Sequence, residues 1–278
     1  MRILVIAKLT FREAARRKIA LTAGLLGLAF LALYNIAFYY VRTQPFGFPT
    51  AALAQSEAIN LLLMAGLYAA NFMTGVMSVL VSADSLAGEI TTGAIHAIAA
   101  KPIRRSEIVL GKWVGFAGLL ALYTLLMAGG LILSVGLQAN FYPPNPLGGI
   151  GLMYLETLLV MSITLAFSSR LSTLATGAAV FGMYGISFLG GWVEQIGAML
   201  KSQSAVDMGV LASLIMPSES LWRRAAFEMT SPLLRTLGNF NPFGGGASVP
   251  SSLMILYAAL YALIALLLAM RTFLKRDL

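Results

Sequence analysis

Residues 83–113 read ADSLAGEITTGAIHAIAAKPIRRSEIVLGKW and form the only long polar interruption in the first two thirds of an otherwise apolar chain. Apolar residues recur at three- and four-residue spacings between residues 90 and 99, which predicts a short amphipathic helix. Pro102 ends this helix, because its ring removes an N–H and disfavours helical angles at the preceding residue. The stretch therefore predicts a small helix and a basic turn that join two membrane helices.

Two interpretations of this connector are open from the residues alone. In the first, its charges only fix the topology, since cytoplasmic loops carry an excess of Lys and Arg. In the second, the small helix is a docking site for a soluble partner. Its apolar face would project beyond the bilayer, and a groove on a partner would cover that face.

The composition places the chain in lipid. Of its 278 residues, 59% are hydrophobic and 11% are charged, against roughly 25% charged in a soluble domain. The formal net charge of +8 does not indicate a nucleic-acid partner, because the basic residues lie at the ends of apolar runs rather than in an aromatic-laced patch. A spanning helix needs about 20 apolar residues. Six runs qualify: 19–41, 58–82, 107–136, 148–169, 171–193 and 252–270.

The sequence thus predicts an all-α membrane protein with one transmembrane domain over residues 1–278. Residues 1–18 place three basic side chains on one helical stripe, which is typical of a helix lying in the membrane interface. Basic residues concentrate in the segments on the side of both termini, so we expect both termini in the cytoplasm and a multi-pass protein of the cell (inner) membrane. Residues 83–106 are then a cytoplasmic loop, and residues 194–251 are an extracytoplasmic segment.

Catalytic and metal-binding patterns are absent from the sequence. Gly111-Lys112 resembles the end of a phosphate-binding loop, but that motif needs Gly at the position of Ser106 and Ser or Thr at the position of Trp113. The chain has no cysteine, and His96 is its one histidine, so we expect no metal site and no cofactor. We therefore expect that the chain is not an enzyme.

Glu156 is the one acidic residue well inside a predicted span. A charge there costs roughly 2.5 to 3.5 kcal/mol on insertion scales, so Glu156 should face protein or water, or be protonated. Either a functional role facing a lumen or a structural hydrogen bond inside the bundle fits, and the second is favoured. Two sets of small residues predict close helix approaches, within or between chains. They are Gly66, Ala70, Thr74 and Ser78 in one span, and Gly111 and Gly115 in another.

The run from Glu89 to Lys112, EITTGAIHAIAAKPIRRSEIVLGK, resembles the coupling region of ABC-2 type transporter permeases. The pattern has Glu, Gly-Thr-Leu, a Lys-Pro turn with Arg, and a closing Gly-Lys; Ala94 and Ile95 replace the common Thr-Leu. Residues 12–18, 167–172 and 215–225 resemble the elbow helix, the second cytoplasmic return and the outer segment of that family. The subgroup that contains the permease for nitrous-oxide reductase maturation looks nearest.

The resemblance implies a membrane subunit that pairs with a second permease, as a homodimer or heterodimer, and with a separate cytoplasmic ABC ATPase. Export of a substrate by alternating access is then expected, in contact with membrane lipid. The residues expected to dock the ATPase are Glu89, Gly93, Ile95, Ile98, Pro102 and Arg105. An ATP-independent channel or carrier, or a membrane assembly scaffold, is the alternative. The sequence does not identify the substrate.

Overall fold

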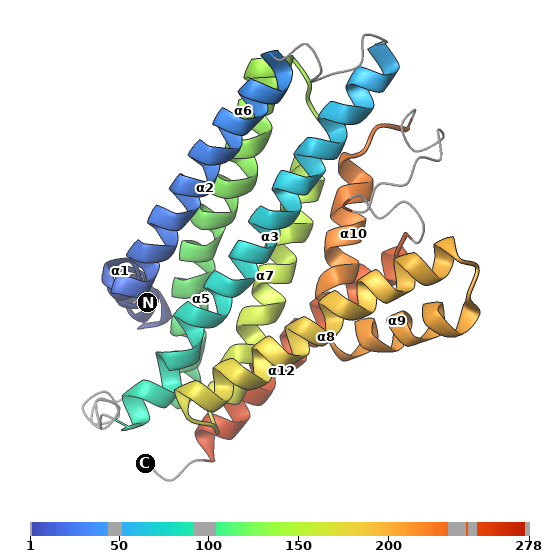
Figure 1. Cartoon of the computed structure of the whole chain (residues 1–278). Coiled ribbons are helices and arrows are strands. Elements are labelled where there is room, and N and C mark those ends of the chain that lie inside the picture. Colours follow the sequence, from blue (N-terminus) through green and yellow to red (C-terminus); the bar gives the residue numbers. More distant parts are fainter. Residues whose placement is uncertain (1, 44–51, 92–103, 233–242, 244–248, 276–278) are drawn as a thin grey trace.

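The structure is a computed structural model that describes residues 2–43, 52–91, 104–232, 243 and 249–275. The described residues form helices and turns, with no β-strand among them. Six helical stretches are long and apolar enough to cross a membrane, which confirms the six predicted spans (Figure 1). They are Lys18–Thr43 (α2), Gln55–Gly88 within α3 (Ala52–Thr91), Arg105–Ala139, Pro146–Ser168 (α7), Thr173–Met199 (α8) and Ser252–Leu274 (α12).

The third span is a continuous helical rod made of three parts. Helix α5 (Arg105–Thr124) passes through a π-helical turn at Leu125–Gly129 into α6 (Gly130–Ala139). Asn140 closes the rod with a left-handed backbone, φ 52°, a conformation that Asn adopts more readily than most residues. Asn145 then caps α7, accepting a hydrogen bond from the Gly148 N–H over 3.1 Å. The predicted separation of the third and fourth spans is confirmed.

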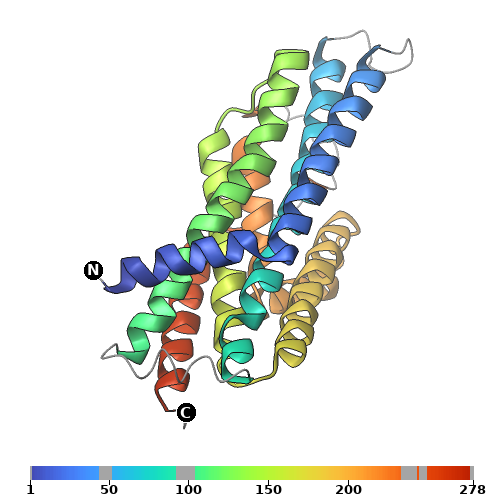
Figure 2. The same cartoon turned by 90° about the vertical axis from the view of Figure 1, so that its left-hand side faces the viewer.

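The N-terminal helix α1 (Arg2–Arg16) crosses the long helices instead of running along them (Figure 2). It packs on α5 at two glycines. A Cβ at Gly111 would lie 2.6 Å from the Ile6 Cβ, and one at Gly115 would lie 2.6 Å from the Ala7 carbonyl oxygen. The predicted close approach at these glycines is confirmed, and α1 is the element that approaches. The interfacial position of α1 stays a prediction.

The other set of small residues packs α3 against helices of the same chain. At Gly66 a Cβ would lie 2.5 Å from the ring of Tyr34 on α2. Further along, the Ser78 hydroxyl donates to the Thr157 carbonyl oxygen on α7 over 3.1 Å. Helix α3 is therefore held between α2 and α7 by residues small enough to let the backbones approach.

The segment between the fifth and sixth spans contributes two more helices. Helix α8 continues past the predicted end at residue 193 and reaches Met199. Helix α9 (Gln203–Ile215) folds back against α8, and α10 (Ser218–Met229) packs against α7 beside α3 (Figure 1). Much of α10 is buried, so this part of the predicted outer segment belongs to the bundle.

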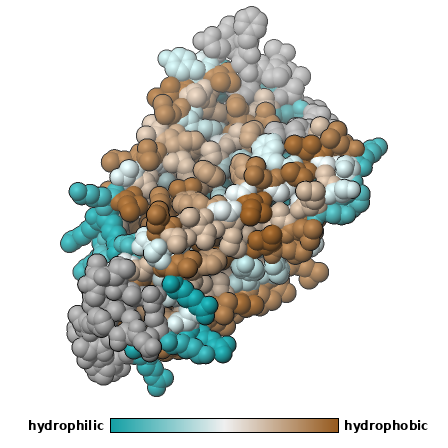
Figure 3. Space-filling view, turned by 60° about the horizontal axis from the view of Figure 1, so that its bottom comes forward, coloured by the Kyte–Doolittle hydropathy of each residue, from teal (hydrophilic) through white to brown (hydrophobic). Residues whose placement is uncertain are grey.

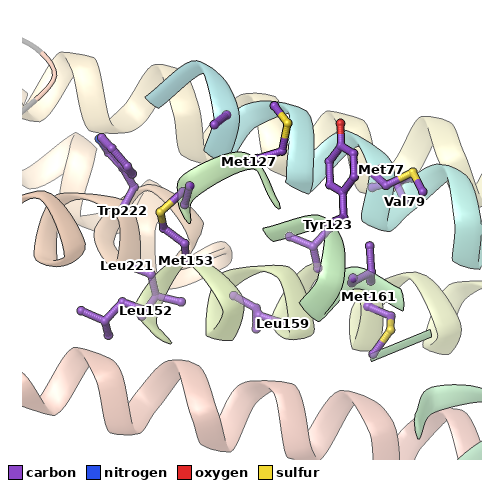
Figure 4. Close-up of a cluster of buried hydrophobic side chains, with 14 of the residues drawn as sticks. Met77, Val79, Tyr123, Met127, Leu152, Met153, Leu159, Met161, Leu221 and Trp222 are labelled. Carbon is purple, nitrogen blue, oxygen red and sulfur yellow. The ribbon is translucent and has the colours of Figure 1, made fainter. Parts of the chain in front are cut away.

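Methionines and leucines fill the space between α3, the third span, α7 and α10 (Figure 4). Met127, Met153, Leu159 and Met161 are fully buried there, and Trp222 of α10 is almost so. Lipid chains are as apolar as these side chains, so the cluster stabilises the bundle mainly through van der Waals packing. The flexible thioethers fit the irregular gaps between helices.

Apolar side chains also cover the outside of the bundle. Figure 3 shows a broad hydrophobic surface, with hydrophilic side chains gathered toward its margins. Leu25, Leu33, Leu137 and Leu253 are each more than half exposed, and such side chains recur along α2, α6 and α12. This surface has the character that contact with lipid requires.

Candidate functional site

Glu156 lies at the middle of the fourth span. Helix α7 runs from Pro146 to Ser168, so Glu156 is about 15 Å along the axis from one end and about 18 Å from the other. It is 2% exposed, and its carboxylate accepts hydrogen bonds from Asn71 Nδ2 over 2.8 Å and from the Tyr184 hydroxyl over 3.2 Å. The structure thus places this sequence-predicted residue inside the bundle, where two donors offset the cost of burying it.

A second buried carboxylate, that of Glu219, lies in the first turn of α10. The Tyr68 hydroxyl on α3 donates to it, with both carboxylate oxygens 3.3 Å away. The indole N–H of Trp192 on α8 donates in turn to the Tyr68 oxygen over 3.0 Å. The ring centroid of Tyr68 also lies 5.2 Å from that of Trp222. These contacts join α3, α8 and α10 around one tyrosine.

The third carboxylate forms a buried ion pair with α10. Arg223 Nη2 lies 2.7 Å from Glu194 Oε2, and the two side chains are 1% and 5% exposed. Breaking such a buried pair by removing one partner costs about 3–5 kcal/mol, because a buried charge is left behind. The pair fixes α10 to the end of α8.

Burial raises the pKa of Glu219 to about 7, above its ordinary value of 4.5. The positive charge of Arg223 and the hydrogen bond from Tyr68 lower this pKa, while the negative charge of Glu194 raises it. A carboxyl group with a pKa near neutrality changes its charge when its surroundings change. The pKa of Glu219 is therefore set by contacts from α3, α8 and its own helix α10.

We call these residues the mid-bundle cluster. They are contributed by α3, α7, α8 and α10, and comprise Tyr68, Asn71, Glu156, Tyr184, Trp192, Glu194, Glu219 and Arg223. Three carboxylates and one guanidinium are held together there, each no more than 6% exposed. Its hydrogen bonds and its ion pair link these four helices to one another.

Sequence reasoning found Glu156 but missed the rest of the cluster. Glu156 gave a signal because it interrupts an apolar run. Glu219 and Arg223 follow Pro217 in a polar stretch, where an acid in the first helical turn is ordinary. The sequence gives one signal for helix α10. A polar stretch long enough for a helix follows directly after an apolar run that ends in proline.

A second set of polar contacts holds the end of α3. The Ser168 hydroxyl, at the end of α7, donates to the Ala83 carbonyl oxygen over 2.7 Å. It accepts from the backbone N–H groups of Leu86 and Ala87, over 3.3 and 3.1 Å. A side chain that enters the hydrogen-bond ladder of a helix in this way is a common origin of bending.

Three more elements are bonded to the same turn of α3. Asp84 accepts from Arg17, which joins α1 to α2, over 3.1 Å and from the Thr173 hydroxyl of α8 over 2.9 Å. Lys112 of α5 donates to the Ser85 carbonyl oxygen over 2.5 Å and is 5% exposed. Lys112 thus lies in the helix α5 and its ammonium group is buried. In a phosphate-binding loop the lysine would instead be free to contact a phosphate. We call Arg17, Asp84, Ser85, Lys112, Ser168 and Thr173 the α3-end cluster.

The predicted docking residues lie directly beyond this cluster. Glu89 belongs to the last turn of α3, and Arg105 begins α5, where its Nη1 lies 3.5 Å from the Leu274 carbonyl oxygen of α12. The other four, Gly93, Ile95, Ile98 and Pro102, and the predicted amphipathic helix itself, lie outside the described residues. Within the residues that the structure describes, no group of three or more His, Cys, Asp or Glu side chains is arranged to hold a metal ion.

The fold and these two clusters define the class: a polytopic helical membrane protein whose spans are bonded to one another by buried polar groups. The family model described as ABC-2 family transporter protein matches residues 4–278. The chain therefore belongs to the ABC-2 transporter family, which confirms the family that its sequence resembles. It is a membrane component of a transport system rather than itself an enzyme. No curated protein matches the chain.

Proposed function

We propose that the chain is the permease subunit of an ATP-driven exporter, and that a separate cytoplasmic ABC ATPase docks on the part of the predicted loop from Glu89 to Arg105, beyond the buried turn of α3. Permeases of this family generally work with an ATPase subunit. The observation that carries the proposal is the position of the α3-end cluster, where the chain enters the predicted docking segment. A partner that displaces this segment acts on the last turns of α3 and the first turn of α5.

The contacts of Asp84, Lys112 and Ser168 support a route from the docking segment into the bundle. Four elements are bonded to the same turn of α3, so a shift of that turn breaks or moves contacts to each of them. Helix α3 also carries Asn71 and Tyr68, which bond the carboxylates of the mid-bundle cluster. Helix α3 is the element through which ATPase movement reaches the middle of the membrane.

The complete assembly in this proposal contains two permeases and two ATPases in the cell (inner) membrane, with both termini of this chain cytoplasmic. Substrate crosses outward by alternating access between the two permeases. The resemblance over the whole chain favours the subgroup with the nitrous-oxide reductase maturation permease. An exposed basic stripe on α1, which includes Lys8 and Arg12, supports an interfacial helix at the cytoplasmic surface.

A second candidate, an ATP-independent carrier, is favoured by one observation. Three carboxylates are buried together in the mid-bundle cluster, and carriers often use intramembrane acids to move protons. Each of these carboxylates contacts a neighbouring helix, through Asn71 and Tyr184, through Arg223 or through Tyr68, and such contacts suit a structural role.

The experiment is reconstitution of the purified complex in proteoliposomes. Permease that co-purifies with an ABC ATPase should hydrolyse ATP, and permease stripped of its partner should neither bind nor hydrolyse ATP. Replacing Ser168 with Val should leave the ATPase bound while reducing the permease-dependent part of its hydrolysis, because the contacts at the α3 end are lost. Robust ATP binding by the isolated chain, or transport driven by a proton gradient without any ATPase, would refute the assignment.

A further inference from the structure

A groove with two contrasting parts lies between the ends of α7 and α12, beside α8. Its first part has a volume of about 470 Å³ and apolar walls, which include Ile163, Phe167, Met183, Tyr261 and Ile264. Its second part has a volume of about 620 Å³ and lies where α7 and α12 end. The two parts share Arg170, Leu268 and Thr272 and are therefore continuous.

The second part is basic. Arg170, Arg271 and Lys275 line it, together with the Ser169 and Thr272 hydroxyls, which hydrogen-bond to each other. None of the three cationic side chains forms a hydrogen bond or ion pair with the described part of the chain, and no acidic residue of that part lines either hollow. Three cations converge on one opening, an arrangement that suits a phosphate group.

The length of the groove matches one leaflet of a bilayer. Along α12, Arg271 lies ten positions after Tyr261, so the apolar part extends about 15 Å from the basic opening. The hydrocarbon core of a bilayer is about 30 Å thick, and half of it is the depth that an acyl chain of one leaflet occupies. Ile264 and Leu268 on the wall are 56% and 48% exposed, so the groove is open to the surrounding lipid.

We propose that this groove is a binding site for an anionic glycerophospholipid, which we call the lipid groove. The phosphate lies against Arg170, Arg271 and Lys275, and an acyl chain lies along the apolar walls toward Tyr261. A basic opening joined to an apolar groove at the end of a span is complementary in charge and in length to this ligand. The site requires only that the chain spans a bilayer, so its test is independent of the proposed ATPase.

The test measures lipid retention by native mass spectrometry on the purified full chain, titrated with phosphatidylglycerol or phosphatidylcholine. We expect wild-type chain to retain one phosphatidylglycerol in preference to phosphatidylcholine. Replacing Arg170 and Arg271 together with Gln should weaken phosphatidylglycerol binding about 30-fold at low salt. The matched control removes Arg42 and Lys201 in the same way, at exposed positions outside the groove, and should bind as wild type does.

A third variant, Ile264→Trp, fills the apolar wall and leaves every charge in place. It should also weaken phosphatidylglycerol binding, whereas inorganic phosphate should neither bind tightly nor compete. The proposal is overturned if the Arg170 and Arg271 variant binds as wild type does, or if phosphatidylcholine binds equally well. It is also overturned if inorganic phosphate displaces the lipid while Ile264→Trp has no effect, which would indicate a simple anion site. Disulfide cross-linking of two copies through Ile264→Cys would instead identify a contact between chains.

Discussion

Gly115 is a position where one added methyl group tests the packing of α1 on α5. A Cβ there would lie 2.6 Å from the Ala7 carbonyl oxygen and 2.8 Å from the Thr10 Cβ. Ordinary contact begins at 3.4 Å, so α1 would have to retreat by about 0.8 Å, and backbone atoms cannot rotate away as a side chain can. Overpacking of this kind costs about 1–3 kcal/mol, while replacing a helical Gly gains about 0.5–1 kcal/mol. Gly115→Ala should therefore lower the stability by up to about 2.5 kcal/mol, with a central value of about 1.2 kcal/mol.

Gly118 provides a matched control three residues along the same helix. There a Cβ would lie 3.6 Å from the ring of Phe11, which is ordinary contact. Gly118→Ala should raise the stability by about 0.5–1 kcal/mol, because only the gain in helix propensity remains. The assay is thermal unfolding of the purified proteins in one detergent, with about 2–4 °C expected per kcal/mol. If both variants shift Tm in the same direction, the packing of α1 on α5 is not as described.

Three further predictions address topology, burial and pH. Cysteines introduced singly at Ser106 and Ser252 should react with an impermeant maleimide from opposite faces of the membrane, the first from the cytoplasm; reaction of both from one face would contradict the six-span topology. Asn71→Leu should cost about 1–3 kcal/mol because the buried Glu156 carboxylate loses one of its two donors, and adding Glu156→Met should recover part of that loss in the same unfolding assay; a double variant less stable than Asn71→Leu would contradict this pairing. Burial raises the pKa of Glu219 from 4.5 to about 7. Between pH 4.5 and pH 7 the folded state therefore keeps a proton that the unfolded state has released. The free energy of unfolding should therefore fall between those pH values and then level off, and Glu219→Gln should flatten this dependence; an unchanged pH profile in that variant would contradict the burial of Glu219.

The six spans follow from the sequence because insertion into lipid depends on local properties, namely length and apolar content. The ends of the spans follow less well. The apolar run 171–193 predicts that the fifth span ends at residue 193, directly before the charged Glu194. In the structure Arg223 neutralises Glu194, and the helix continues to Met199. That partner comes from α10, 29 residues further along the chain, and no local pattern encodes it.

In the candidate site, too, local sequence predicts some features, while others depend on tertiary contacts. Glu156 could be found because a single acid in an apolar run is costly wherever the helix packs. The sequence also predicted close packing at Gly111 and Gly115, but the element that approaches them is α1, which depends on tertiary structure. Ser168 gave no signal, because a serine at a helix end is common and its three backbone partners belong to α3.

The central claim, coupling to an ATPase through residues 83–106, is tested most directly at Ile98. The measurement is ATP hydrolysis and ATPase content of the complex purified from membranes that hold equal amounts of wild-type chain or Ile98→Asp. Burial of Ile98 in a partner groove would be worth about 1.5–3 kcal/mol, so Ile98→Asp should release most of the ATPase, while Arg105→Ala should release less.

Val249→Asp supplies the matched apolar-to-acidic control, since Val249 is exposed near the start of α12, at the opposite end of that span from the docking segment. It should retain the ATPase and its hydrolysis in full. The account predicts that ATPase content and ATP hydrolysis both fall in Ile98→Asp. Neither quantity should fall in Val249→Asp. Full ATPase association and transport by Ile98→Asp would contradict it, and residues 83–106 would then be a connector that only fixes the topology.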